Sequence, residues 1–458
     1  MKRIKWGISK LIAGLALLSW PLLLSGEHSN AVRSTTRQPM PVDLPLPEYE
    51  LANLNADTLM ISPKDTNMHK FLGELRSLRS GKDTVINIVH LGDSHLQAGY
   101  LTGKAMRLLQ STFGNAGRGW LTPYRLARTN APDDYSIISN LKSWTSGKCI
   151  QAHPKTEIGI GGLGIKTTSS PIKFNVSISE RYGEEYGFNR LVVYRDYDSS
   201  PMMPADNNDV AVKYRPSIKD NVPGLRADTF YLASPSMTLH LESSSDDCSS
   251  STYYGFNVMN GNPGILYHMI GVNGARYSSY NDDEYVRQLS LLHPALIIIS
   301  LGTNDSFGRF DSDTFEDQVS EMVHLIKKNI PSAAILLETP PGSFLRSRTR
   351  VVTRVRRKKG RRRRTVTSSR LSYRVNNYTE VAEASIISVA HRENISCFDL
   401  FGVSGGADAV PDWLKAGLLS RDRVHYNSKG YYEQATLLVR ALLHSYNSTL
   451  DSHANRQH

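Results

Sequence analysis

The chain has 458 residues, of which 40% are hydrophobic and 21% charged, and its formal net charge is +11. This length predicts about two or three domains, and the composition excludes both a disordered chain and a bundle of membrane helices. The positive charge is local, because Arg346–Arg364 holds twelve basic and no acidic residues and the rest of the chain has a net charge of −1. The charge therefore gives no support to a fold that binds specific nucleic-acid sequences.

Residues 1–26 have the pattern of a secretory signal peptide. Four basic residues among the first ten precede the apolar stretch Leu11–Leu24, which is interrupted by Pro21 and is short for a membrane span. We expect export to the periplasm, the cell envelope or the medium, with no stable membrane span once the signal is removed. An uncleaved membrane anchor is the alternative interpretation. Residues 27–66 are rich in proline and polar residues, and we expect a linker or a poorly ordered arm there.

From residue 67 onward, apolar runs alternate with helical patterns. Three runs are typical of strands buried on both faces of a parallel sheet: Thr84–Leu91, Ala295–Leu301 and Ala333–Leu337. Helical patterns lie at about 101–113, 283–292, 314–329, 371–392 and 428–446. This alternation predicts a doubly wound, three-layer α/β domain of the flavodoxin-like kind, made of residues 67–121 and 266–446 and followed by a tail at 447–458.

Residues 122–265 show a different pattern. Apolar and polar residues alternate in short segments such as Ile172–Ser179 and Met237–Glu242, with glycine, proline, serine and asparagine between them. Such segments are typical of antiparallel strands with one wet face. We therefore expect an all-β sandwich or jelly roll inserted into the α/β domain. Its aromatic residues are either core residues or part of a carbohydrate-binding surface.

Three short polar motifs follow elements of the α/β domain. They are Gly92-Asp93-Ser94-His95, Gly302-Thr303-Asn304-Asp305 and Asp422-Arg423-Val424-His425. The first two follow buried strands, and the third precedes the last helix. Because ligands of open α/β sheets bind outside the carboxyl ends of the strands, the first two motifs point to one crevice.

These motifs supply the side chains that nucleophilic catalysis needs. A serine hydroxyl requires a base, and the base requires an orienting carboxylate; Ser94, His425 and Asp422 fit these roles. The oxyanion of an acyl-transfer intermediate needs donors, for which the Asn304 amide and the N–H groups of Ser94 and Gly274 are candidates. Taken singly, the same residues are typical of a helix N-cap, a turn and a surface loop, but their order along the chain favours a catalytic site.

The motifs resemble those of the SGNH (GDSL-type) hydrolases. Gly92-Asp93-Ser94 matches the nucleophile block, with His95 where a leucine is common, and Gly271-Val272-Asn273-Gly274 matches the glycine block. The segments that begin at Gly302 and Asp422 match the asparagine and Asp-x-x-His blocks. The Gly-Asp-Ser-His form and the long β insert are similar to exported peptidoglycan O-acetylesterases, whose insert resembles a carbohydrate-binding module. The resemblance implies ester hydrolysis without a metal or organic cofactor.

A second serine motif competes with the first. Gly402-Val403-Ser404-Gly405-Gly406 fits the G-x-S-x-G turn of α/β-hydrolases and follows an apolar run. That turn requires a helix directly after the serine. We expect Gly405, Gly406 and Pro411 to prevent such a helix, which favours Ser94 as the nucleophile.

Three cysteines are too few for a disulfide scaffold, and no Cys/His spacing resembles a zinc site. Cys397 is expected in the core, and a pair between Cys149 and Cys248 is left open. The basic segment 345–366 predicts either a solvated, disordered loop or a tether to an anionic envelope polymer. No aromatic residue interrupts Arg346–Arg364, so base stacking is unsupported there.

The expected function is that of an exported serine esterase that removes O-acetyl groups from a carbohydrate, with peptidoglycan or another envelope glycan as the substrate class. Two alternatives are open. A lipase or thioesterase of the same fold would accept longer acyl chains. A non-catalytic protein would use the insert and the basic segment to bind envelope polymers.

Overall fold

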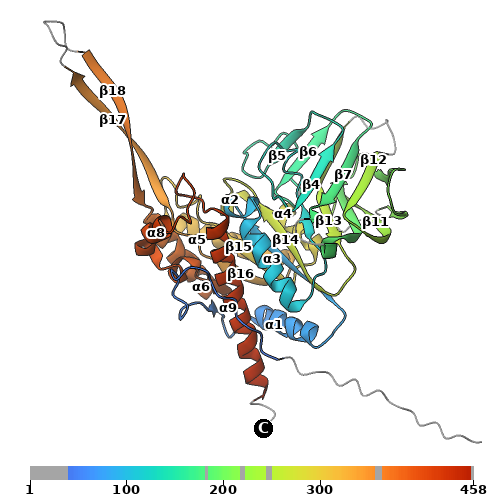
Figure 1. Cartoon of the computed structure of the whole chain (residues 1–458), viewed down its shortest axis with the longest axis horizontal. Helices are drawn as coiled ribbons and strands as arrows, with labels where there is room; N and C mark the ends of the chain where they lie inside the picture. The colour runs from blue at the N-terminus through green and yellow to red at the C-terminus, as the bar shows by residue number, and fades with distance from the viewer. Residues whose placement is uncertain (1–39, 181–183, 217–221, 244–249, 356–363, 455–458) are drawn as a thin grey trace, which may run out of the picture. The chain divides into compact units, whose positions relative to one another are not determined.

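The computed structural model describes residues 40–180, 184–216, 222–243, 250–355 and 364–454. A central sheet of six strands has the order β1-β19-β16-β15-β2-β14 (Figure 1). Strand β1 is antiparallel to β19, and the other neighbours are parallel. The strands are β1 (Leu59–Met60), β2 (Val85–Gly92), β14 (Gly264–Gly271), β15 (Leu296–Ser300), β16 (Ala334–Glu338) and β19 (Ser396–Phe398).

Helices cover both faces of this sheet because its strands are apolar on both faces. In β15, Leu296 and Ile298 belong to one hydrophobic core, while Ile297 and Ile299 belong to a second core on the other side. Helices α1, α3 and α9 contact one another over the first core, and α4, α5 and α6 line the second. The predicted three-layer α/β domain is confirmed.

The helices of this domain are α1 (Thr66–Arg79), α2 (Ser94–Gln97), α3 (Tyr100–Phe113), α4 (Asp283–Leu289), α5 (Ser312–Asn329), α6 (Tyr378–Glu393), α7 (Leu400–Val403), α8 (Gly406–Lys415) and α9 (Ser428–Ala454). Short 3-10 turns lie at Glu184–Tyr186, Tyr277–Ser279 and Ser290–Leu292. Within the described residues, no helix combines the length and the apolar character that crossing a membrane requires.

Three neighbouring strands end at the same level of the sheet. Gly92, the last residue of β2, pairs with Gly271 of β14 on one side and with Ser300 of β15 on the other. A Cβ atom on Gly92 would lie 2.6 Å from both the Ser300 carbonyl oxygen and Leu96 Cδ1, so this position requires glycine. The register brings together the loops that carry the nucleophile, glycine and asparagine blocks.

The region between α3 and β14 forms two further antiparallel sheets. One has the order β10-β11-β8-β13-β6-β5 with β3 on β13, and the other has the order β4-β7-β12-β9. Their apolar faces meet, as in the contact of Phe174 with Tyr253, whose ring centroids lie 5.1 Å apart. This packing agrees with the predicted β-sandwich insert. The strands are β3 (Gly119–Leu121), β4 (Tyr135–Ser139), β5 (Thr145–Lys148), β6 (Leu163–Thr167), β7 (Lys173–Ile178), β8 (Phe188–Asp196), β9 (Met202–Pro204), β10 (Val212–Arg215), β11 (Leu225–Ser236), β12 (Thr238–Ser243) and β13 (Ser251–Met259).

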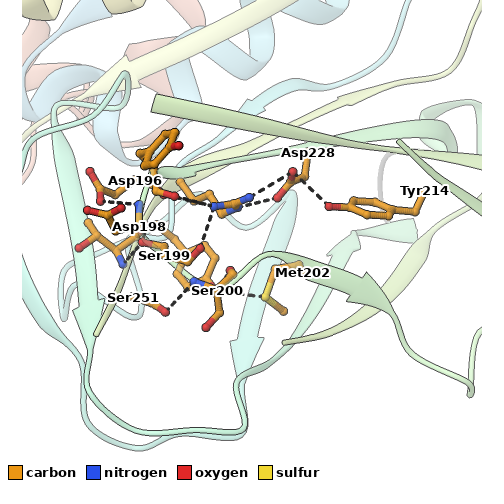
Figure 2. A network of polar contacts seen from close by, with 12 residues as sticks. Asp196, Asp198, Ser199, Ser200, Met202, Tyr214, Asp228 and Ser251 are labelled. Carbon is orange, nitrogen blue, oxygen red and sulfur yellow. Dashed lines mark hydrogen bonds and ion pairs between the residues drawn. The ribbon is translucent and has the colours of Figure 1, made fainter. Parts of the chain in front are cut away.

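A buried ion pair braces the insert (Figure 2). The Arg195 guanidinium donates to Asp228 Oδ2 at 2.6 Å, and Tyr214 donates to Asp228 Oδ1 at 3.3 Å. Arg195 also donates to the Ser199 carbonyl oxygen at 2.7 Å, which ties the turn after β8 to the sheet. Removing one member would leave a buried charge without its partner, a change that costs several kcal/mol (~3–5).

The basic segment is not the predicted loop. Residues on either side of its centre form a long antiparallel hairpin of β17 (Phe344–Val355) and β18 (Arg364–Val375), seen in orange in Figure 1. The helix expected from residue 371 consequently begins at Tyr378 as α6. The expectation of a loop was wrong because like-charged side chains that point into solvent do not prevent the backbone hydrogen bonds between two antiparallel strands.

Two other boundaries also differ from the predictions. The described part of the arm expected at 27–66 packs on the domain: Val42 exchanges hydrogen bonds with the Asn447 side chain, and Leu59 pairs with Phe398. The predicted tail at 447–458 is helical as far as Ala454, since it continues α9. Tyr446, just before it, packs in the core against Phe113 and holds this end of the helix on the domain. Residues 1–39, with the predicted signal peptide, lie outside the described residues.

Cys397 is a buried free thiol, as predicted for a core cysteine. Cys149 is also free in the structure, and burial raises the pKa of its thiol to about 12 although the Tyr280 hydroxyl opposes the shift. The sequence left open a disulfide between Cys149 and Cys248, and Cys248 lies outside the described residues.

Candidate active site

The predicted nucleophile lies on the turn between β2 and α2. Asp93 caps the short helix by accepting the N–H of His95 at 2.9 Å, and Ser94 is the first residue of the helix. The N–H of Ser94 is one of the first helical N–H groups, which have no acceptor inside the helix. On the neighbouring strand, a Cβ atom on Gly271 would lie 2.7 Å from Gln97 N, so the glycine lets this turn pack closely. Ser94 is half-buried at the sheet edge.

The predicted base and its carboxylate lie on the loop before α9. Asp422 Oδ1 accepts the N–H groups of Val424 and His425 at 2.9 and 3.0 Å, which closes the loop on itself. The N–H of Ser420 donates to the His425 carbonyl oxygen at 2.8 Å. Arg423, between the two site residues, has a left-handed backbone with φ +60°. The loop is therefore held by its own hydrogen bonds.

The structure brings Ser94, His425 and Asp422 into one hydrogen-bonded chain. His425 Nε2 lies 2.8 Å from Ser94 Oγ, and His425 Nδ1 lies 2.8 Å from Asp422 Oδ2. Burial would raise the pKa of Asp422, but hydrogen bonds from His425 and from the loop N–H groups outweigh it and lower this pKa. An ionised Asp422 accepts a hydrogen bond from Nδ1–H, which keeps the proton on Nδ1 and leaves Nε2 free to accept the Ser94 proton.

Gly274 lies on the loop that follows β14. Its φ of +83° favours glycine, and a Cβ atom there would meet only Ile150 Cδ1, at 3.9 Å. This openness allows a ligand atom to approach the backbone closely. Gly274 lies on the loop after β14, the strand that pairs with β2, and its role as an oxyanion donor stays a prediction.

Asn304 follows β15 and reaches the same turn. Its Nδ2 donates to Asp93 Oδ2 and to the Ala275 carbonyl oxygen, each at 3.0 Å. These bonds hold the amide between the nucleophile turn and the Gly274 loop. Because both of its N–H groups have partners, the amide must share one of them to stabilise an oxyanion.

A supporting network was missed by the sequence reasoning. Gln97 Oε1 accepts the N–H of Asn273 at 2.7 Å, and Gln97 Nε2 donates to the Asn130 carbonyl oxygen at 2.7 Å. Asn273 Nδ2 donates to Asn130 Oδ1 at 2.7 Å, and Tyr124 donates to the Gly271 carbonyl oxygen at 2.7 Å. Residues at the start of the insert thus brace the Gly274 loop. The sequence feature that could have indicated Gln97 is its position three residues after Ser94, within the same short helix.

Two buried carboxyl groups lie behind the site. Burial raises the pKa of Asp93 to about 7, with a further contribution from nearby Asp305 and with opposing hydrogen bonds from His95 and Asn304. Burial raises the pKa of Asp305 to about 6. Both groups are side chains of the sequence motifs, and neither was predicted to titrate.

His95, which stands where related sequences often have leucine, is buried beside His425. The centroids of the two rings lie 5.3 Å apart, and His95 Nδ1 lies 3.1 Å from the Tyr431 hydroxyl oxygen. Burial lowers the pKa of His95 to about 3, and the neighbouring His425 adds to this effect. A neutral ring therefore supports His425 without competing for its proton.

The competing serine motif is placed differently. The expectation that its glycines and Pro411 prevent a helix was wrong, because α8 begins at Gly406 and contains Pro411. Ser404 nevertheless ends α7, is 7% exposed, and its Oγ has no hydrogen-bond partner within the described part of the chain. The buried hydroxyl is unsuited to attack a substrate. Within the same residues, no group of three or more His, Cys, Asp or Glu side chains is arranged to hold a metal ion.

The fold and the arrangement of these loops are those expected from the resemblance to the SGNH hydrolases. Residues 249–432 match the GDSL-like lipase/acylhydrolase family, and the Ser94 turn precedes this range.

A peptidoglycan O-acetylesterase structure shares the fold, with a TM-score of 0.61 and 21% identity over 82% of this chain and 96% of that chain. A Bacillus subtilis protein aligns at 14% identity over 71% and 92% of the two chains with a TM-score of 0.31. The esterase EstA from a Pseudoalteromonas species aligns at 16% identity over 40% and 78%, with a TM-score of 0.24. No curated protein sequence matches the chain.

Proposed function

We propose that the protein is an exported serine esterase of the SGNH type that removes O-acetyl groups from a carbohydrate, with peptidoglycan or another cell-envelope glycan as its substrate class. The observation that carries the proposal is the chain of two 2.8 Å contacts from Ser94 through His425 to Asp422. This chain lies at the carboxyl edge of the sheet, beside the loops of Gly274 and Asn304.

In the first half-reaction, Ser94 Oγ attacks the carbonyl carbon of the acetyl ester while His425 Nε2 takes the hydroxyl proton. The negative charge on the carbonyl oxygen is stabilised by the N–H groups of Ser94 and Gly274 and by a shared N–H of Asn304. His425, now protonated and oriented by Asp422, gives its proton to the departing sugar oxygen. The C–O bond of the ester breaks, and an acetyl group remains on Ser94.

In the second half-reaction, His425 takes a proton from water, and the resulting hydroxide attacks the acetyl carbonyl carbon. The same donors stabilise the second oxyanion. When the intermediate collapses, Ser94 Oγ leaves and recovers its proton from His425. Acetate is released, and the protein's own side chains make all the proton transfers.

Three observations support the substrate class. The likeness to the peptidoglycan O-acetylesterase covers 82% of the chain, which is more than the α/β domain alone. The basic and apolar pattern of residues 1–26 supports delivery to the envelope. The insert also carries a groove of about 450 Å³ that is lined by polar side chains.

This groove lies on the outer face of the sheet β4-β7-β12-β9. Asn175 and His240 are paired across neighbouring strands and line its floor, with Asn140 and the Lys173–Glu242 ion pair at one side. Asn175 Oδ1 is buried without a partner among the described residues. Amide, imidazole and charged groups of this kind bind sugar hydroxyls, so we assign the groove to glycan binding.

The experiment measures acetate released by the purified protein. The wild type should release acetate from p-nitrophenyl acetate and from O-acetylated peptidoglycan, and more slowly from acetylated xylan. Esters of longer acyl chains should react poorly, which separates the proposal from a lipase or thioesterase. Release that is equal in wild type and Ser94→Ala contradicts the mechanism. Binding to sacculi without release from any ester would favour a non-catalytic protein.

A further inference from the structure

The hairpin of β17 and β18 has one face lined with arginine. Arg346, Arg348 and Arg350 alternate along β17 and point to the same side, about 7 Å apart. Their cross-strand partners in β18 are Tyr373, Leu371 and Ser369, so this face has no acidic side chain opposite the arginines. We call the three arginines the arginine row.

The arginine row is exposed, and nothing within the hairpin neutralises it. Its three side chains face solvent, as do Arg370 and Arg374 on the other face. From 344 to 375 the sequence contains no aspartate or glutamate. Like charges this close repel one another, and a two-stranded ribbon has little stability of its own. A bound polyanion would remove this repulsion, and the planar guanidinium groups suit carboxylate or phosphate oxygens.

The apolar neighbours of the row indicate which polyanion fits. Val352 continues the same face and is 55% exposed, and Leu371, opposite Arg348, is 46% exposed. The C–H faces of sugar rings pack against such side chains. The Arg423 guanidinium already stacks on one face of the aromatic Tyr373, 4.1 Å from its ring centroid, so that face is not available to a nucleic-acid base.

The base of the hairpin rests on the loop of the active site. The N–H of Phe344, the first residue of β17, donates to the Arg423 carbonyl oxygen at 2.9 Å. Arg423 lies between Asp422 and His425, and its guanidinium also lies 5.8 Å from the Phe344 ring centroid. The arginine row therefore begins two residues from a contact with the loop that carries the catalytic histidine.

We propose that the arginine row binds an anionic polysaccharide and holds the enzyme on this polymer with its active-site loop beside the chain. The choice of a polysaccharide rests on the proposed function, since a glycan esterase meets its acetyl esters on such polymers. Binding depends on exposed charges, so it should weaken as salt is added.

The test measures co-sedimentation of Ser94→Ala protein with polygalacturonate, a carboxylate polysaccharide, immobilised on beads. The inactive form keeps the result independent of ester hydrolysis, so failure of the proposed activity does not affect it. We expect binding at low salt, loss of binding at 0.5 M salt (about a 4 Å screening length), and little binding to neutral dextran. Changing the arginine row to glutamine, Arg346→Gln, Arg348→Gln and Arg350→Gln, should weaken binding about ten-fold.

The matched control removes the same charge elsewhere, at the exposed Lys64, Lys82 and Lys155, each changed to glutamine. It should bind as the parent does. In the active enzyme, the arginine-row variant should hydrolyse p-nitrophenyl acetate normally, because its changed side chains face solvent. Equal binding by the two triple variants overturns the proposal. Tighter binding to double-stranded DNA than to polygalacturonate at equal charge overturns the choice of polysaccharide.

Discussion

His425 Nε2 lies 2.8 Å from Ser94 Oγ, although 331 positions separate the two residues in the sequence. Ser94 is held by the turn after β2, and His425 by a loop that closes on Asp422 and rests on the start of α9. The contact thus depends on α9 packing against α3 across one face of the domain. Each residue is positioned by its own local hydrogen bonds, and the fold brings the two together.

Replacing Asp422 by asparagine should lower kcat by roughly 10²- to 10⁴-fold while the protein stays folded. Asparagine has a similar shape, but its amide no longer holds His425 in the tautomer that accepts the Ser94 proton. Hydrolysis of p-nitrophenyl acetate and the thermal midpoint measure the two effects. A variant with wild-type kcat would show that Asp422 does not orient His425.

Replacing Asn304 by alanine should lower kcat by about 10²- to 10³-fold with a small change in KM, because an oxyanion donor acts in the transition state. The change also removes the hydrogen bond to Asp93. Steady-state kinetics with p-nitrophenyl acetate separate the two constants. If KM rises and kcat is unchanged, Asn304 binds substrate and does not stabilise the oxyanion.

Tyr431→Phe should lower the free energy of unfolding by about 1–3 kcal/mol, because it leaves the buried Nδ1 of His95 without a partner. His95→Leu should also lower it, by removing the ring nitrogen that the Tyr431 hydroxyl contacts. The double variant should cost less than the sum of the two, since both changes remove one contact. Urea unfolding of the three variants tests this; full additivity would mean that the two side chains do not interact.

The contribution of Asp93 and Asp305 to the stability of the protein should fall as pH rises from about 4 to 7. The folded pKa values of Asp93, about 7, and Asp305, about 6, lie above the ordinary value of 3.8, so the folded state binds more protons in this range. Asp305→Asn should remove as much as about 3 kcal/mol of this fall. Chemical unfolding between pH 4.5 and 8 measures it, with the exposed Asp206→Asn as the matched control. An unchanged slope in Asp305→Asn would contradict the assignment.

Much of the α/β domain was predictable because its strands are apolar on both faces. The runs that contain β2, β15 and β16 were found in this way, and the β-sandwich insert was found from its alternating segments. Strand β14 was missed as an element, since its sequence, Gly264–Gly271, directly follows the insert without a break in pattern. The two-residue strand β1 pairs with the three-residue strand β19, which in turn pairs with β16, and local patterns do not reveal strands this short.

The site residues were named from short motifs, and the structure places Ser94, His425 and Asp422 within hydrogen-bond distance. Gln97 and Asn130 could not be named, because their roles depend on the approach of the insert to the Gly274 loop. The hairpin was missed for another reason. Its arginine-rich strands lack an apolar face, so their pairing depends on backbone hydrogen bonds that leave no apolar periodicity in the sequence.

The most direct test of the account is acetate release from O-acetylated peptidoglycan by the wild type and by Ser94→Ala under identical conditions. We expect release by the wild type and, in the variant, a loss of at least about 10³-fold, while both proteins unfold at similar temperatures. Release by Ser94→Ala at the wild-type rate would contradict the central claim that Ser94, activated by His425, is the nucleophile.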